Sequence, residues 1–241
     1  MKVLIAIVNC HSRYAYANAQ RETWIPEIPE GVDYKFFLGR GGQRESKSDE
    51  VFLDCGDGYT SLPEKVQAII RWAKEHGYEF ILKCDDDVIL LPVEWLASGF
   101  DQHDFTGWAN VHNREWSSPW GFCYTLSKWA MDIIIDSTLP DHYNDEGWVS
   151  QNLLRQGGIR LHSDVRYCLH GGLKENFALQ LKRPLRKVKW VGTQSRFPEV
   201  PGAFAWAMYI EWLGYRKCPD ELNIKEMKRV YARERGLEFE E

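Results

Sequence analysis

The sequence predicts an α/β fold in which helices cover both faces of a mostly parallel sheet. Apolar runs of strand length at residues 2–9, 34–38 and 79–84 alternate with helix-like segments at 11–24 and 62–76. Within the first run, residues 3–8 are all apolar, which is typical of a strand that is buried on both faces. In such sheets ligands bind beyond the carboxyl ends of the strands, so we expect the functional site there.

The second half of the chain is less regular, and we expect one domain over residues 1–241 without an internal repeat or linker. Short strands are predicted at residues 51–53, 120–126 and 159–161. Helices are predicted at residues 128–136, within 143–156, at 203–215 and at 224–235.

The composition describes a protein able to fold around a core, because 44% of its 241 residues are hydrophobic. Eleven tryptophans either fill that core or line a pocket that stacks on sugars. The six cysteines form no C-x-x-C pair, and no apolar run reaches the length of a membrane span. We therefore expect reduced thiols and a cytoplasmic location, which for a viral protein is the cytoplasm of its host.

Positive charge is concentrated in residues 166–196, which contain eight Lys or Arg and one acid, Glu175. That segment carries +7, so with −5 for the whole chain the remainder carries −12. A solvated basic face, a loop that closes over a diphosphate, or a nucleic-acid contact each explain the pattern. The residues that would contact nucleic acid or an acceptor are Lys182, Arg183, Arg186, Lys187, Lys189 and Trp190.

Three adjacent carboxylates, Asp85, Asp86 and Asp87, follow the strand predicted at residues 79–84. Carboxylates this close repel one another unless a cation lies among them. Hard divalent ions prefer oxygen ligands and keep positions open for phosphate oxygens. An exposed acidic turn is the alternative, and the position after a buried strand favours the metal and nucleotide site.

Several short segments in this order resemble the β-1,3-galactosyltransferase and fringe family of glycosyltransferases. Residues 80–88 are similar to its F-x-L-K-x-D-D-D-V segment. The other matches are Arg21-Glu22-Thr23-Trp24, Phe36-Phe37-Leu38-Gly39, the D-x-Y-x-x-L-x-x-K pattern from Asp57 to Lys65, Trp72, and Tyr124-Thr125-Leu126-Ser127. The resemblance covers roughly residues 21 to 127 and implies a GT-A-like core, here in a short soluble member without a membrane anchor.

The resemblance implies a metal-dependent transfer of sugar from a UDP-sugar, with Mn²⁺ or Mg²⁺ as the ion. It assigns the ion to Asp87 and to a late histidine, for which His170 is preferred over His162. Asp85 and Asp86 would contact the nucleotide. Candidate contacts to its phosphates or base are Arg13, Arg21 and Lys174. Lys83 precedes the triplet on a strand and is expected to pair with an aspartate rather than with the ligand.

An inverting transfer needs a general base for the acceptor hydroxyl, and Asp145 and Glu146 are the candidates. The resemblance places Asp145 slightly ahead, whereas capping of the following helix would explain both acids without catalysis. Residues 1–100 would bind the sugar nucleotide, 101–172 the acceptor and the catalytic groups, and 173–241 a basic loop and C-terminal helices.

The acceptor remains open at this point. It is a glycan or small molecule, or a hydroxymethylated base in DNA if the basic segment binds nucleic acid. A metal-dependent phosphohydrolase or nuclease, and a nucleotide-binding protein without catalysis, are the other functional classes compatible with the carboxylates.

Overall fold

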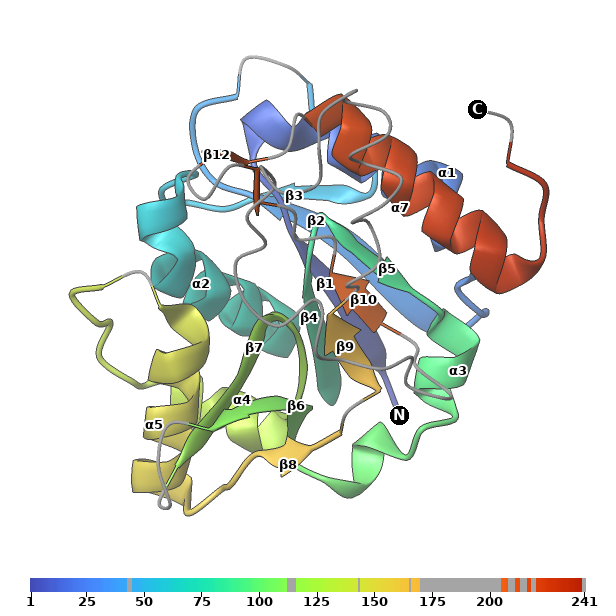
Figure 1. Cartoon of the computed structure of the whole chain (residues 1–241). Coiled ribbons are helices and arrows are strands. Elements are labelled where there is room, and N and C mark those ends of the chain that lie inside the picture. The colour runs from blue at the N-terminus through green and yellow to red at the C-terminus, as the bar shows by residue number, and fades with distance from the viewer. Residues whose placement is uncertain are drawn as a thin grey trace.

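A seven-stranded sheet of order β3-β2-β1-β4-β7-β6-β8 forms the centre of the computed structural model (Figure 1). The structure describes residues 1–42, 45–111, 116–142, 144–164, 166–169, 205–207, 211–212, 216–217 and 220–239. The strands are β1 (Val3–Val8), β2 (Val32–Leu38), β3 (Glu50–Phe52), β4 (Phe80–Asp85), β6 (Phe105–Val111), β7 (Ser117–Ser127) and β8 (His162–Ser163). Pairing is parallel except where β7 meets β4 and β6, which confirms the predicted mostly parallel α/β sheet.

Strand β1 explains why the sheet needs cover on both sides. All six of its residues are buried, and their side chains alternate between two separate hydrophobic clusters. Val3, Ile5 and Ile7 belong to one cluster, and Leu4, Ala6 and Val8 belong to the other. A strand of this kind is stable only when helices cover both faces.

Helices α2 (Leu62–Glu75), α4 (Lys128–Ile135) and α5 (Asp145–Gly157) cover one face of the sheet. The other face packs against α1 (Tyr14–Glu22), α3 (Pro92–Leu96) and α7 (Asp220–Arg235), with α7 beside α1 (Figure 1). Single 3₁₀ turns lie at His11–Arg13, Ile25–Glu27, Tyr59–Ser61 and Phe100–Gln102. Within the described ranges, no helix combines the length and the apolar character that crossing a membrane requires.

The prediction of a helix at residues 203–215 is wrong for residues 205–207 and 211–212, the parts of this range that the structure describes. β10 (Ala205–Ala207) and β11 (Glu211–Trp212) are strands; β10 pairs with β5 (Val88–Leu90) and β9 (Tyr167–Leu169), and β11 pairs with β12 (Arg216–Lys217). A largely apolar segment suits either conformation, and here Ala205–Ala207 pairs with β5 on one side and with β9 on the other.

The strand predicted at residues 159–161 is also wrong, and the strand in this region is β8. Gly158 ends α5 in a left-handed conformation, with φ of 64°. The Ile159 N–H still donates to Leu153 O, so this residue belongs to the end of the helix.

The motif that runs from Asp57 to Lys65 joins the ends of two strands to a helix. The Asp57 carboxylate accepts hydrogen bonds from the backbone N–H of His11 (2.8 Å) and of Gly39 (2.7 Å). Lys65 Nζ lies 2.9 Å from Asp57 Oδ1 and also donates to Asn9 O at 2.8 Å. Because Lys65 is buried on α2, these bonds fix the carboxyl ends of β1 and β2 against that helix.

We predict that Lys65→Met destabilises the fold by roughly 2–3 kcal/mol, because it leaves Asp57 without its cation in a largely enclosed site. Lys74→Met is the matched control on the same helix. Lys74 pairs with Asp132, but both side chains are about 40% exposed, at 43% and 40%. Its loss should cost under about 1 kcal/mol. Urea unfolding of the two variants measures the difference, and equal midpoints would contradict it.

Candidate active site

The carboxylate triplet lies where β4 ends, as the sequence predicted. Asp85 is the last residue of β4, Asp86 and Asp87 form a turn, and β5 begins at Val88. β4 runs parallel to β1, and Asp85 aligns with Val8, the last residue of β1. The turn therefore lies at the carboxyl edge of the parallel half of the sheet, where α/β folds bind their ligands.

Helix α1 and the residues just after it hold the backbone of this turn. Gln20 Nε2 donates to Val88 O at 2.8 Å and to Asp85 O at 3.2 Å. Trp24 Nε1 donates to Val88 O at 3.1 Å. Both donors are buried, so the carbonyl groups on either side of the turn are satisfied from within the protein.

Asp86 and Asp87 share one cation, Arg13. Asp86 is buried and accepts hydrogen bonds from Asn9 Nδ2 (2.8 Å) and Arg13 Nε (2.8 Å). Arg13 Nη2 also lies 3.0 Å from Asp87 Oδ2. Burial raises the pKa of Asp86, although Arg13 opposes the rise. Arg13 is thus close to the triplet, as predicted, and its observed partners are the carboxylates themselves.

Asp85 faces a second cation, Lys83, whose side chain is 3% exposed. Lys83 Nζ lies 2.7 Å from Asp85 Oδ1 and donates to Gly121 O on β7. Asp145 Oδ2 is 3.7 Å from the same nitrogen and accepts a hydrogen bond from Tyr124 Oη at 3.2 Å. The pairing of Lys83 with an aspartate matches the prediction.

The first turn of α5 presents two acids in different surroundings. Asn144 caps the helix by accepting from Gly147 N, and Asp145 and Glu146 follow it. Asp145 is buried at 2% exposure, whereas Glu146 is half-buried and lies against Gly121, where an added Cβ would be 2.9 Å from its Oε2. Burial and the neighbouring Asp145 raise the pKa of Glu146 to about 7. Of the two acids, Glu146 is the more accessible, and Asp145 is held within the protein by Tyr124 and Lys83.

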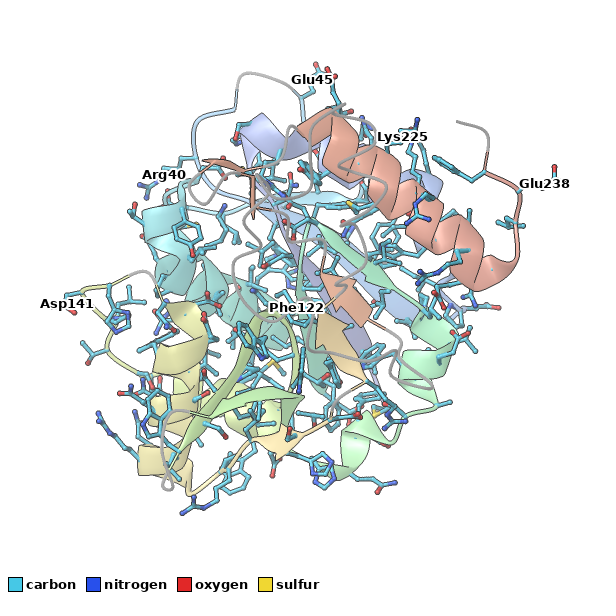
Figure 2. The ribbon with its side chains drawn as sticks, in the orientation of Figure 1. Arg40, Glu45, Phe122, Asp141, Lys225 and Glu238 are labelled. Atoms are coloured by element: carbon cyan, nitrogen blue, oxygen red, sulfur yellow. The ribbon has the colours of Figure 1, made fainter. Side chains whose placement is uncertain are left out.

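Strand β7 is irregular beside these acids. Gly107 pairs with Tyr124 but Ala109 pairs with Pro119, so β7 carries extra residues between the two pairs. Phe122 belongs to this irregular stretch and lies near the centre of the molecule, while Arg40, Asp141 and Glu238 lie at its rim (Figure 2). Such bulges re-aim side chains and backbone groups next to active sites. Here the bulge turns the Gly121 carbonyl toward Lys83.

Two other candidates are not brought to the triplet. Arg21 on α1 pairs with Asp49 at 2.8 Å and with Glu50 at 2.8 Å, which gives it a structural role. His162 is exposed on β8 and stacks on His103, with ring centroids 3.6 Å apart. The remaining predicted residues lie outside the described part of the chain: His170, Lys174, Lys182, Arg183, Arg186, Lys187, Lys189 and Trp190.

Asp87 is the member of the triplet best suited to a metal ion. Within the described ranges, no group of three or more His, Cys, Asp or Glu side chains is arranged to hold an ion. The Asp87 side chain is nevertheless 25% exposed and Asp86 only 6%, so of the two turn residues Asp87 can reach an ion outside the protein core. Asp85 is 35% exposed, but one of its carboxylate oxygens is held by Lys83 at 2.7 Å. Mg²⁺ and similar ions are commonly held by one or two carboxylates together with substrate phosphates. The donor set fits an ion that is shared with a diphosphate.

Three residues of this site were missed by the sequence analysis: Asn9, Gln20 and Tyr124. Asn9 had a usable signal, because it is the first polar residue after the apolar run of β1 and parallel strand ends meet at one edge. Gln20 had none, since its role depends on how α1 is placed against the sheet. Tyr124 belongs to one of the family-like segments, but nothing in the sequence indicated that it bonds Asp145 on α5.

Comparisons with known proteins agree with this fold. Residues 16–109 match the model of the Galactosyltransferase family. Among solved structures, the glycosyltransferase GlyE of Streptococcus pneumoniae superposes with a TM-score of 0.54 at 12% identity, covering 97% of this chain and 62% of GlyE. Its apo form gives 0.51 at 9% identity, covering 98% and 63%.

A glycosyltransferase involved in the glycosylation of the major capsid of PBCV-1 gives a TM-score of 0.48 at 10% identity, with 95% and 100% of the two chains covered. No curated protein matches the chain. This chain spans about three fifths of the length of GlyE, and at these identities the likeness to GlyE concerns the fold. Residues 16–109 thus resemble the Galactosyltransferase family, and the chain has a GT-A glycosyltransferase fold around the carboxylate triplet.

Proposed function

We propose that the protein transfers a sugar from a UDP-sugar to a hydroxyl group with inversion at the anomeric carbon, using Mn²⁺ or Mg²⁺. The observation that carries this proposal is the placement of Glu146. It is a half-buried carboxylate against Gly121, and Gly121 O bonds the same lysine that holds Asp85. A candidate base and the donor-side carboxylates therefore share one edge of the sheet.

On the donor side, Asp87 is the proposed ligand of the ion, and Asp85 and Asp86 are the proposed partners of the nucleotide. Asp85 lies at the end of β4 with its side chain 35% exposed, which leaves it accessible to a ribose hydroxyl. A bound divalent ion would stabilise the negative charge that develops on the departing diphosphate. Arg13 keeps Asp86 and Asp87 in place and lies close enough to them to face a phosphate.

On the acceptor side, Glu146 would take the proton of the attacking hydroxyl. The acceptor oxygen forms a bond to the anomeric carbon as the bond from that carbon to the phosphate oxygen breaks. The electron pair of the broken bond leaves with the nucleoside diphosphate, and the acceptor proton ends on the Glu146 carboxylate. Attack from the face opposite the leaving group inverts the configuration, and a base is required only for this outcome.

A glycan or small-molecule hydroxyl is the proposed acceptor class. A hydroxymethylated base in DNA is the second class, but the basic residues that would favour it lie outside the described part of the chain. Cys10, Cys55, Cys84 and Cys123 are free, which suits the proposed cytoplasmic location.

A donor screen tests the proposal as a whole. The protein is incubated with Mn²⁺ and each common sugar nucleotide, and released nucleoside diphosphate is measured with and without a panel of glycan and hydroxymethylated-DNA acceptors. Selective release from UDP-sugars, increased by one acceptor class, supports the proposal. Equal hydrolysis of all nucleotides would indicate a phosphohydrolase, and UDP binding without release would indicate a protein without catalysis.

For the donor side, we predict that Asp87→Asn weakens Mn²⁺-dependent UDP binding at least about 10-fold, because it removes the charged oxygen ligand. Calorimetric titration of UDP with and without Mn²⁺ measures this effect. Asp101→Asn, at an exposed carboxylate in a 3₁₀ turn, is the control and should bind as the wild type does. Unchanged Mn²⁺ dependence in Asp87→Asn would remove Asp87 from the ion site.

For the acceptor side, we predict that Glu146→Gln lowers kcat by about 10²–10⁴, the range expected when a general base is lost. Its melting temperature and its affinity for UDP should remain near those of the wild type. Asp145→Asn should instead lower the stability, since Asp145 is buried beside Lys83 and Tyr124. If Asp145→Asn instead keeps its melting temperature and loses kcat by about 10²–10⁴, Asp145 is the base.

The pH profile provides an independent prediction. Glu146 has its pKa raised to about 7, and only its deprotonated form accepts a proton. The kcat/KM value should therefore rise as pH increases through about 7 and level off above it. Initial rates between pH 5 and 9 at fixed Mn²⁺ test this, and a wild-type profile that persists in Glu146→Gln would contradict it.

A further inference from the structure

Lys83 is a buried cation that the proposed chemistry does not use. Its side chain is 3% exposed, and it lies on β4 two residues before the triplet. Placing an ammonium group in the protein interior is costly unless its hydrogen-bonding capacity is satisfied. Two hydrogen-bond acceptors and one further carboxylate surround it, and they come from three different elements.

The first partner is Asp85 at the end of β4, 2.7 Å from Nζ. The second is the backbone carbonyl of Gly121 in the irregular stretch of β7. The third is Asp145 in the first turn of α5, with its Oδ2 at 3.7 Å from Nζ and bonded by Tyr124 Oη. These three contacts lie far apart in sequence and meet at one nitrogen.

Each contact adjoins a group of the proposed reaction. Asp85 begins the triplet that faces the donor. Gly121 leaves the space into which Glu146 projects, and Asp145 directly precedes Glu146 on α5. A shift of α5 relative to β4 would therefore change the distance between the donor and the base.

We propose that Lys83 is a positioning residue that sets the distance between the donor-side carboxylates and the catalytic base Glu146. It joins β4, β7 and α5 through one ammonium group and does not contact the substrate. The inference rests on the proposed function of the site. It assigns to Lys83 an effect on the rate of the chemical step in addition to its effect on folding.

Lys83 and Asp145 carry opposite charges, so replacing both residues by neutral ones provides a suitable variant. Lys83→Met alone leaves both Asp85 and the buried Asp145 without their cation, which threatens folding. The double variant Lys83→Met/Asp145→Asn removes the two buried charges and keeps similar side-chain volumes, and Asp85 is 35% exposed and can be solvated by water, so the variant should fold. Lys83→Arg keeps the charge, but a planar guanidinium places its donors differently and cannot reproduce the contacts of an ammonium. Lys74→Met, at an exposed lysine, is the control.

Amide hydrogen exchange tests the positioning without any need for turnover. In the double variant, exchange should become faster at residues 85–87, 120–122 and 145–147 together, while α7 keeps its wild-type exchange rates. Lys74→Met should change none of these segments. Unchanged exchange in all three segments would overturn the proposal.

Steady-state kinetics with the donor found in the screen test the predicted effect of Lys83 on the rate of the chemical step. Misplacement of reacting groups by about 1 Å can cost about 100-fold in rate. The double variant should lose about 10- to 100-fold in kcat, with KM for the donor within about 3-fold and a melting temperature near that of the wild type. Lys83→Arg should lose roughly 10-fold.

A purely structural lysine predicts the opposite result. The folded double variant, or Lys83→Arg if the double variant does not fold, would then retain wild-type kcat, and this outcome would overturn the proposal. If the wild-type protein releases no nucleotide from any donor, the proposed function fails. The exchange data then show separately whether Lys83 joins the three segments.

Discussion

The crowding of carboxylates at the end of β4 is the constraint on which the rest of the site depends. Asp85, Asp86, Asp87, Asp145 and Glu146 gather there, and the described cations that pair with them are Arg13 and Lys83. Like charges at this spacing repel, and burial adds a desolvation cost. The raised pKa values of Asp86 and Glu146 are the consequence of both effects. A site of this kind forms only if the fold places Arg13 and Lys83 within hydrogen-bonding distance of these carboxylates.

The two cations hold different parts of the proposed site. Arg13 comes from the 3₁₀ turn after β1 and serves the two turn residues that project beyond the sheet. Lys83 comes from β4 itself and serves Asp85 and α5. Because Asp85 and Asp86 are adjacent but belong to different cations, Arg13 acts on the turn alone, whereas Lys83 links the triplet to α5. This arrangement suits the proposed reaction, in which a charged nucleotide and a neutral hydroxyl must be held close together.

The features of the site that could be predicted from the sequence are those whose residues lie close together along the chain. The triplet could be placed at a strand end because a buried parallel strand and the acids after it are adjacent in sequence. The choice between Asp145 and Glu146 could not, because neighbouring residues on a helix point about 100° apart. Which one faces the sheet depends on the rotation of α5 against β7. The strand at Ala205–Ala207 was missed for a similar reason, since its partner β5 lies more than a hundred residues earlier.

Gly121 shows how backbone and side-chain chemistry combine at this position. In a regular strand, its carbonyl would bond a neighbouring strand, and a side chain would fill the space that Glu146 occupies. The irregular pairing of β7 with β6 frees the carbonyl for Lys83, and the missing Cβ leaves the carboxylate of Glu146 its place. The bulge and the glycine are therefore parts of one arrangement. A bulge with a larger residue at position 121 would exclude Glu146. A glycine in a regular ladder would keep its carbonyl bonded to the next strand and away from Lys83.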